Sequence, residues 1–429
     1  MNRGSRGAVA RFGALAVADF SSKALAFVAA PIIIRQFGDR AFGDLGIAAQ
    51  MMGFALLFGT CGLDTYSVRT IAVSREGLGR WASTVVLLRL SLGAIGYGAV
   101  LAVAAAVPQY RAVMGLLAVV GLSLFTRATF LDWAAQALQH TRIMAAAMIT
   151  TQAGYVALVV AMVRSHQPLW SVALAQVAAE GATAAWLLWW FHQRVAPLER
   201  PLPVRQWPAL LHHSFPFAGG QLLRGVALGL DLVLLGAFLV PREQIGWYSG
   251  SLKLYQLCGG TVMVYFMIML PRFSVQASKS PAALRGELQR SLRLIVPLGI
   301  AAALVTALLA KRLLFMVGGT IAFEQAAPAL QVLVVAVVIG LIGSHYRNAL
   351  FAMGRQRLDM HNMAVGTVAH VVLKVALIPL LGMFGVALGT LGGETVLMLL
   401  GMWVVHRELE RTDMPGLDLA TSSQRGGTA

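Results

Sequence analysis

Residues 327–350 read APALQVLVVAVVIGLIGSHYRNAL, and apolar side chains dominate this run as far as Gly343. A membrane-spanning helix needs about 20 mostly apolar residues, so the stretch is long enough to cross a bilayer. Backbone polar groups find no water inside a bilayer, and the run is too long and continuous for a barrel strand. It is therefore predicted to form a transmembrane helix, and the fold depends on how often such a run recurs.

Eleven further stretches of this kind occur along the 429 residues. The chain is 58% hydrophobic and only 12% charged, with a mean hydropathy of +0.72, whereas soluble domains are about 25% charged. This composition excludes soluble globular domains and disordered chains, and it predicts an all-α polytopic membrane protein with about 12 transmembrane helices. The expected spans are 12–34, 42–66, 82–107, 112–134, 144–163, 168–191, 213–240, 245–270, 293–315, 327–350, 362–381 and 384–405.

The excess of Lys and Arg sets the expected orientation. The chain has 34 Lys and Arg against 18 Asp and Glu, a formal net charge of +16. In a membrane protein these cations favour cytoplasmic loops, so we interpret the charge as a topology signal and expect no nucleic-acid partner. With the N-terminus inside, 20 of the cations fall in inner segments and 7 in outer ones. Both termini are therefore expected in the cytoplasm of a multi-pass protein.

A Pro- and Arg-rich segment divides the chain near its middle. Residues 192–212 are predicted to form a cytoplasmic linker between an N-terminal six-helix bundle, 1–191, and a C-terminal six-helix bundle, 213–405. Residues 406–429 are predicted to form a disordered cytoplasmic tail. Because each bundle holds an even number of spans, the halves are expected to be parallel repeats around a central cavity. A weak internal similarity, which aligns Gly43 with Gly246, supports this arrangement.

Charged residues inside the spans are the first candidates for function. Each costs about 2.5–3.5 kcal/mol at a helix centre, so such residues normally face the bundle interior or a wet cavity. Lys23 and Arg224 lie mid-span in the first and seventh helices, which are equivalent in the two halves. Two interpretations stay open. These cations line a shared cavity, or they only pair with Asp19 and Asp231, four and seven residues away on the same helical faces.

Two further spans carry polar faces. In the eighth span, Lys253 and Gln256 mark one face, although Lys253 could also extend its ammonium outward. In the eleventh span a polar and small stripe recurs every four residues and is predicted to face water: Asn362, Gly366, His370 and Lys374.

Buried carboxylates form the other set of candidates. Glu180 and Glu394 lie near the centres of the sixth and twelfth spans, which are again equivalent helices. Either residue could balance a nearby cation or take up a coupling ion, H⁺ or Na⁺. Arg89, Arg127 and Asp132 lie toward the cytoplasmic ends of their spans, where we expect them to act as interfacial anchors.

The sequence contains none of the motifs that carry common catalytic chemistry. We find no HExxH, CxxC, Walker or GxSxG pattern, and the His212–His213 pair is a weak metal-site candidate beside the linker. No enzymatic activity, cofactor or metal is therefore expected.

Four stretches, in order along the chain, resemble a known family. They are IRQFG at 34–38 with FG at 42–43 and GLD at 62–64; IGWY at 245–248 with KL at 253–254; YRNAL at 346–350 with GRQR at 354–357; and IPLLGMFGVALGT at 378–390. The sequence is similar to the polysaccharide flippases, within the superfamily of multidrug, oligosaccharidyl-lipid and polysaccharide exporters. The resemblance implies two six-helix bundles around a cationic cavity that opens to one side at a time.

The function expected from the resemblance and the charges is an inner-membrane flippase for an undecaprenyl-pyrophosphate-linked oligosaccharide, working in polysaccharide assembly with other assembly proteins. The lipid tail of the substrate would remain in the membrane and reach the cavity through a lateral gap. Substrate-binding candidates are Lys23, Arg224, Lys253, Lys374 and His370. Candidates for cation balance or ion coupling are Asp19, Glu180, Asp231 and Glu394. The alternatives are a drug exporter of the same architecture, and a membrane glycan ligase or polymerase, for which the expected outer loops are too short.

Overall fold

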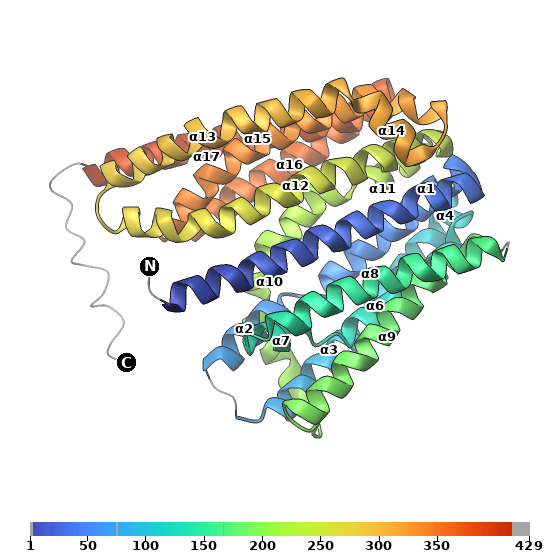
Figure 1. Cartoon of the computed structure of the whole chain (residues 1–429), viewed down its shortest axis with the longest axis horizontal. Helices are drawn as coiled ribbons and strands as arrows, with labels where there is room; N and C mark the ends of the chain where they lie inside the picture. Colours follow the sequence, from blue (N-terminus) through green and yellow to red (C-terminus); the bar gives the residue numbers. More distant parts are fainter. Residues whose placement is uncertain (1–2, 74–75, 166, 414–429) are drawn as a thin grey trace.

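The computed structural model describes residues 3–73, 76–165 and 167–413, and within them the chain is almost entirely helical and has no strand (Figure 1). The predicted all-α membrane protein is thus confirmed. The helices of the first half are α1 (Arg3–Thr60), α2 (Leu63–Val73), α3 (Leu78–Ala106), α4 (Pro108–Arg111), α5 (Met114–Val120), α6 (Ser123–Ala128), α7 (Asp132–Ala137), α8 (Thr141–Arg164) and α9 (Trp170–Arg194). Those of the second half are the 3₁₀ turn η1 (Val204–Gln206), α10 (Trp207–Gly229), α11 (Asp231–Ala237), α12 (Arg242–Ala277), α13 (Pro281–Leu308), α14 (Ala310–Gly318), η2 (Ile321–Ala326), α15 (Ala327–Ala352), α16 (Gln356–Leu381) and α17 (Met383–Asp413).

The number of candidate spans differs from the sequence-based expectation. Within the described residues, nine helices are long and apolar enough to cross a membrane, or ten if the bent pair α10–α11 forms one span. The expected count of twelve is therefore not confirmed. One of the nine, Val17–Ala72, has 56 residues, and Gly38 interrupts it with a left-handed φ of 83°. At 1.5 Å per residue it is long enough for two passes.

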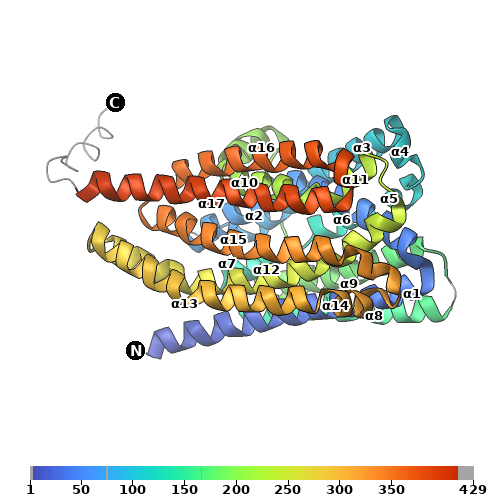
Figure 2. The same ribbon diagram turned by 90° about the horizontal axis from the view of Figure 1, so that it is seen from above.

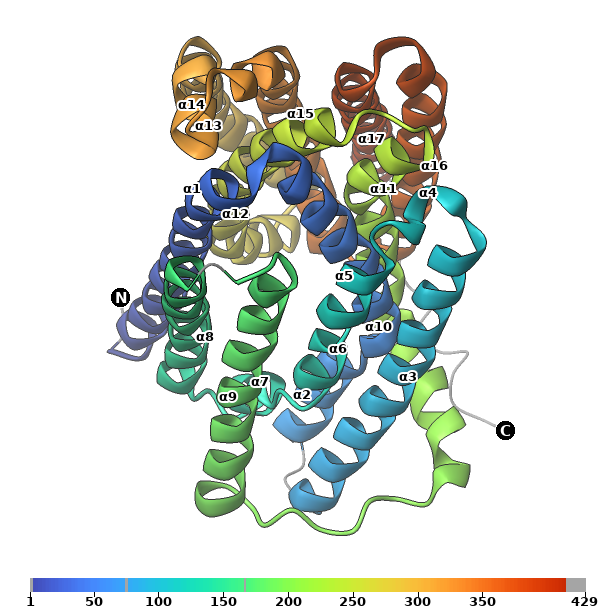
Figure 3. The same cartoon turned by 90° about the vertical axis from the view of Figure 1, so that its right-hand side faces the viewer.

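The helices form two groups with α1 and α12 between them (Figures 1 and 3). One group contains α13, α15, α16 and α17, which run along the long axis of the molecule (Figure 2). The other contains α2, α3, α7, α8 and α9. The start of α1 and the end of α17 lie at the same end of the molecule, opposite the ends of α4, α11 and α14 (Figure 1).

The buried apolar side chains join the two groups at one end only. Near the Gly38 turn, a continuous core includes Ile47 from the first half and Tyr248 from the second. At the opposite end each half has its own core, one around Trp133 and the other around Phe273. Since apolar burial is the main source of cohesion, the halves are held together mainly at the Gly38 end. At the other end the start of α10, through Trp207, Leu210 and Leu211, packs against the core of the first half.

The joined end contains a reciprocal backbone contact. An added Cβ on Gly43 would strike the carbonyl oxygen of Arg242, and one on Gly246 would strike the carbonyl oxygen of Asp39. The same offset of 203 residues relates Gly43 to Gly246 and Asp39 to Arg242. Equivalent residues of two units meet in this reciprocal way at a two-fold axis. The alignment of Gly43 with Gly246 therefore corresponds to a contact in space.

The segments outside the bundles differ from expectation at their edges. The region between the halves is non-helical only from about residue 195 to residue 203, because α9 continues to Arg194 and α10 begins at Trp207. The predicted tail was placed too early: α17 extends through Asp413, so residues 406–413 are helical. The remainder of the predicted tail, 414–429, lies outside the described residues.

Candidate functional site

Lys23 and Asp19 lie side by side on α1 at the edge of an apolar cavity. The Lys23 Nζ is 2.6 Å from the Asp19 Oδ2, and the two side chains remain 40% and 38% exposed. Both line a cavity of about 700 Å³ whose other walls come from α12, α13 and α15 and are almost wholly apolar. The predicted local pair is therefore confirmed. It does not exclude a lining role, because the pair also faces the cavity.

Arg224 does not pair with Asp231 as its spacing suggested. Its guanidinium lies 2.8 Å from Glu394 on α17, which is only 3% exposed. The prediction fails because α10 ends at Gly229 and α11 leaves at an angle of 49°. A face shared by positions i and i+7 requires a continuous helix, and the bend turns Asp231 away from Arg224.

Asp231 is instead satisfied by two residues from other helices. The Lys374 Nζ on α16 lies 2.5 Å from its Oδ1, and the Tyr248 hydroxyl donates to its Oδ2 over 2.7 Å. Lys374 also donates to the carbonyl oxygen of Ala227 over 2.6 Å, and its side chain has no exposed surface. All partners of this pair belong to the second half, so it ties α11, α12 and α16 together.

The predicted water-facing stripe on α16 is wrong for this arrangement. His370 and Lys374 are fully buried and Gly366 is buried, while Asn362 is partly exposed. His370 packs against Gly393, and its Nε2 lies 3.9 Å from Glu394. The four-residue spacing correctly predicts a common face, but that face contacts α10, α11 and α17 rather than water.

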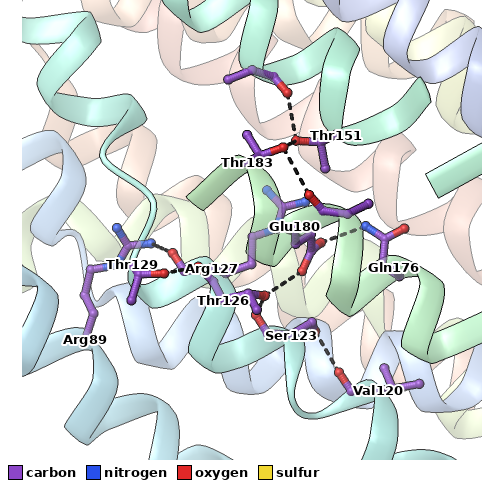
Figure 4. A network of polar contacts seen from close by, with 12 residues as sticks. Arg89, Val120, Ser123, Thr126, Arg127, Thr129, Thr151, Gln176, Glu180 and Thr183 are labelled. Atoms are coloured by element: carbon purple, nitrogen blue, oxygen red, sulfur yellow. Dashed lines mark hydrogen bonds and ion pairs between the residues drawn. The ribbon is translucent and has the colours of Figure 1, made fainter. Parts of the chain in front are cut away.

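Glu180 on α9 is the centre of a polar network within the first half (Figure 4). It accepts hydrogen bonds from the Arg127 Nε at 3.0 Å, the Thr126 hydroxyl at 3.0 Å and the Gln176 amide at 2.7 Å. Its side chain is only 4% exposed, whereas Arg127 is 43% exposed. Glu180 is thus a cation-balancing carboxylate in this structure, as Glu394 is in the second half.

The expected role of Arg89 as an interfacial anchor is wrong, because its side chain is buried. Arg127 forms an ion pair with Glu180, and the Arg89 side chain is only 5% exposed. Arg89 lies 3.2 Å from Asp64 and donates to the backbone carbonyls of Arg127 and Phe130. The Arg127 carbonyl lies in the last turn of α6, which ends at Ala128, and the Phe130 carbonyl lies in the segment between α6 and α7.

Lys253 is a central cation whose described neighbour is an aromatic ring and not a carboxylate. Its Nζ lies 5.8 Å from the centroid of the Phe42 ring, and no carboxylate among the described residues pairs with it. Lys253 lines a second cavity, of about 370 Å³, between the two halves. The polar residues Gln50 and Tyr155 also line this cavity and were not predicted from the sequence. An uncharged glutamine within an apolar span was the one signal that could have identified Gln50.

Polar contacts also close the joined end of the molecule. Arg242 lies 3.5 Å from Asp44, and the Trp247 indole donates to Asp39 over 2.8 Å. The Gln50 amide oxygen accepts hydrogen bonds from the backbone nitrogens at the start of α11. These contacts could not be predicted from the sequence, because their partners lie more than 180 residues apart along the chain.

No group of three or more His, Cys, Asp or Glu side chains in the described parts of the chain is placed to hold a metal ion. The histidines of the His212–His213 pair pack edge to face, with ring centroids 5.8 Å apart.

Solved structures with the same fold are membrane transporters and flippases. An inward-facing multidrug resistance MATE family transporter of the MOP superfamily matches with a TM-score of 0.75 at 13% identity, over 93% of this chain and 100% of that chain. The lipid II flippase MurJ in an inward closed conformation also gives 0.75 at 13% identity, over 93% and 89%. An outward-facing MATE family transporter gives 0.61 at 13% identity, over 94% and 96%. No curated protein matches the chain.

The family model described as "Polysaccharide biosynthesis protein" matches residues 8–276, which is more than half of the chain. That match extends from α1 to the end of α12, so it includes Lys23, Glu180, Arg224 and Lys253. The chain is a multi-pass membrane protein with the fold of MATE transporters and MurJ, and it belongs to the polysaccharide biosynthesis protein family.

Proposed function

We propose that this protein is a flippase of the bacterial inner membrane that moves undecaprenyl-pyrophosphate-linked oligosaccharide units from the cytoplasmic to the outer leaflet. The units would serve O-antigen, exopolysaccharide or capsule synthesis. The family match and the transporter fold support a role in moving a polysaccharide precursor. Transport proceeds by alternating access and is driven by an H⁺ or Na⁺ gradient.

The observation that carries the proposal is the position of Lys23. A lipid-linked pyrophosphate has an anionic head and a long apolar tail, so its site needs a cation beside an apolar space. Lys23 provides the cation, and the adjoining cavity of about 700 Å³ is lined almost wholly by apolar side chains. Exposed apolar residues on α13, among them Leu298, extend that surface toward the membrane. Arg224, which is 35% exposed, and Lys253 add positive charge for the head and the glycan.

A small, organic cation as substrate fits these observations less well. The apolar cavity does contain the carboxylate of Asp19, which is the group such a substrate would need. That carboxylate is paired with Lys23, so either substrate must open the pair; the apolar walls that extend over α13 favour a substrate with a long lipid tail. The drug-exporter alternative therefore predicts release of Asp19 from Lys23, and transport of an organic cation in place of a lipid-linked glycan.

We further propose that the joined end of the bundles faces the outside. The helical arrangement matches the inward-facing MATE transporter better than the outward-facing one. The excess of Lys and Arg lies at the end of the molecule where α1 begins. Reporter fusions at residue 280, between α12 and α13, and at residue 420 should both give cytoplasmic signals. A periplasmic signal at either position would contradict the orientation.

The test of the function is lipid-linked glycan translocation in proteoliposomes. The charge-neutral double variant Lys23→Met with Asp19→Leu should fold and transport at least about tenfold more slowly, since a charge-assisted hydrogen bond is worth roughly 1.5–3 kcal/mol. Collapsing both the H⁺ and the Na⁺ gradient should stop net transport by the wild type.

The matched control is Lys279→Met, which replaces an exposed lysine between α12 and α13. This variant should transport normally. A double variant that transports at the wild-type rate would show that the pair is only structural. Wild-type protein that moves an organic cation but no lipid-linked glycan would favour the drug exporter.

A further inference from the structure

A second cavity, which is more polar than the first, lies on the other side of α12 from the apolar cavity. Leu257 and Cys258 of α12 line the apolar cavity, whereas Lys253 and Gln256 line the polar one. The other polar side chains that line this second cavity are Gln50 on α1, Ser123 on α6, Tyr155 on α8, Gln176 on α9 and Ser249 on α12. Both halves therefore contribute to a single space of about 370 Å³, which we name the glutamine pocket.

Much of the hydrogen-bonding capacity of the glutamine pocket is unused. Gln50 accepts two backbone hydrogen bonds through its amide oxygen, but its amide nitrogen donates to none of the described residues. Gln176 donates to Glu180 and keeps its amide oxygen free. The Tyr155 hydroxyl and the Gln256 amide also have no partner within the described parts of the chain. Amides and hydroxyls that both donate and accept are complementary to the hydroxyl groups of a sugar.

The charge of the glutamine pocket is equally distinctive. Six cations within the predicted spans have a carboxylate within 3.2 Å: Lys23, Arg89, Arg127, Arg224, Arg347 and Lys374. The cavity wall around Lys253 contains no Asp or Glu, so its ammonium is the only charge there. A charge held in a membrane protein without a counter-charge is costly, and an anionic ligand would reduce that cost.

We propose that the glutamine pocket is a sugar-binding subsite and that Lys253 selects a sugar residue bearing a carboxylate. This inference rests on the proposed function, because it assigns one part of the lipid-linked glycan to one cavity. The apolar cavity and Lys23 hold the lipid-proximal part of the substrate. The glutamine pocket, on the opposite side of α12, holds an acidic sugar through Lys253 and its hydroxyls through the free amides.

The test compares two substrates that differ in one group. Wild type, Lys253→Gln and Lys253→Arg are placed in proteoliposomes with two lipid-pyrophosphate oligosaccharides, one ending in a uronic acid and the other in the matching neutral hexose. Lys253→Gln should slow transport of the acidic substrate about tenfold and of the neutral one less than twofold. Lys253→Arg should retain the preference, because it keeps the charge.

Binding of the free acidic oligosaccharide to the purified protein, measured by calorimetry, provides a readout that does not depend on transport. Lys253→Gln should weaken it about tenfold, and Lys279→Gln, an exposed lysine, should leave it unchanged. If Lys253→Gln slows transport of the acidic and the neutral substrate equally, Lys253 contacts the pyrophosphate, and the sugar subsite is overturned. Binding of the acidic sugar without transport of either lipid would overturn the proposed function while supporting the subsite.

Discussion

Gly246→Val should abolish transport while the protein still folds. The Gly246 Cα lies so close to the first half that even an added Cβ would overlap the carbonyl oxygen of Asp39, and this neighbour is backbone that cannot rotate away. A valine there would hold the two halves apart at their joined end. Each half has its own core at the opposite end, around Trp133 and around Phe273, so the bundles should survive the separation.

The reciprocal position gives a second, independent variant. Gly43 approaches the carbonyl oxygen of Arg242 in the same way, so Gly43→Val should have the same effect. Small residues at such crossings allow helices in membranes to approach closely. Gly53→Val is the matched control, because Gly53 also lies on α1 but a Cβ there meets nothing within 4 Å.

The measurement combines translocation in proteoliposomes with thiol labelling from the outside. Cys61 and Cys258 are first replaced by serine, and a cysteine is then introduced at Ser249, which is buried at the joined end. Both valine variants should transport no lipid-linked glycan above the protein-free background, and the new cysteine should react faster than in the Gly53→Val background. Transport at the wild-type rate in Gly246→Val would show that the halves need not close at this contact.

The membrane-spanning elements could be predicted from the sequence because a bilayer imposes one length on every span. Residues 327–350 correspond to α15, Ala327–Ala352, and 362–381 fall within α16, Gln356–Leu381. Breaks within spans were harder to predict. The expected span 112–134 is divided among α5, α6 and α7, and no proline marks either interruption.

The partners of the charged residues could not be predicted from helical spacing alone. Lys23 and Asp19 were paired correctly because four residues of one continuous helix separate them. Glu394 lies 170 residues from its partner Arg224, and only the packing of α10 against α17 brings them together. Periodicity reveals which residues share a face, but not which helix that face meets.

The buried glutamates of the two halves have different arginine partners. Glu180 on α9 and Glu394 on α17 are each buried beside an arginine of their own half. The arginines nevertheless come from different positions, Arg127 from the fourth predicted span and Arg224 from the seventh. The reciprocal contact of Gly43 and Gly246 could thus be inferred from sequence similarity, whereas the partners of the buried carboxylates could not.

Lys374→Met should cause a large loss of stability, because it leaves Asp231 buried without its cation. Asp231 is 1% exposed, and only the Tyr248 hydroxyl would remain as its partner. Removing one member of a buried ion pair typically costs about 3–5 kcal/mol. The change should therefore lower the thermal melting temperature in detergent markedly, whereas Lys279→Met at an exposed position should have little effect.

The double variant Lys374→Met with Asp231→Asn separates a structural pair from a transport residue. Asparagine keeps an oxygen that can accept the Tyr248 hydrogen bond, and methionine fills the lysine volume without charge. Replacing a buried pair by neutral groups of similar size is often close to neutral in stability. Because Lys374 has no exposed surface and all its partners lie in the second half, the double variant should recover the melting temperature and transport within about twofold of wild type. A folded double variant that fails to transport would instead place this pair in the transport cycle, with Asp231 as the carboxylate that releases Lys374 to take up the coupling ion.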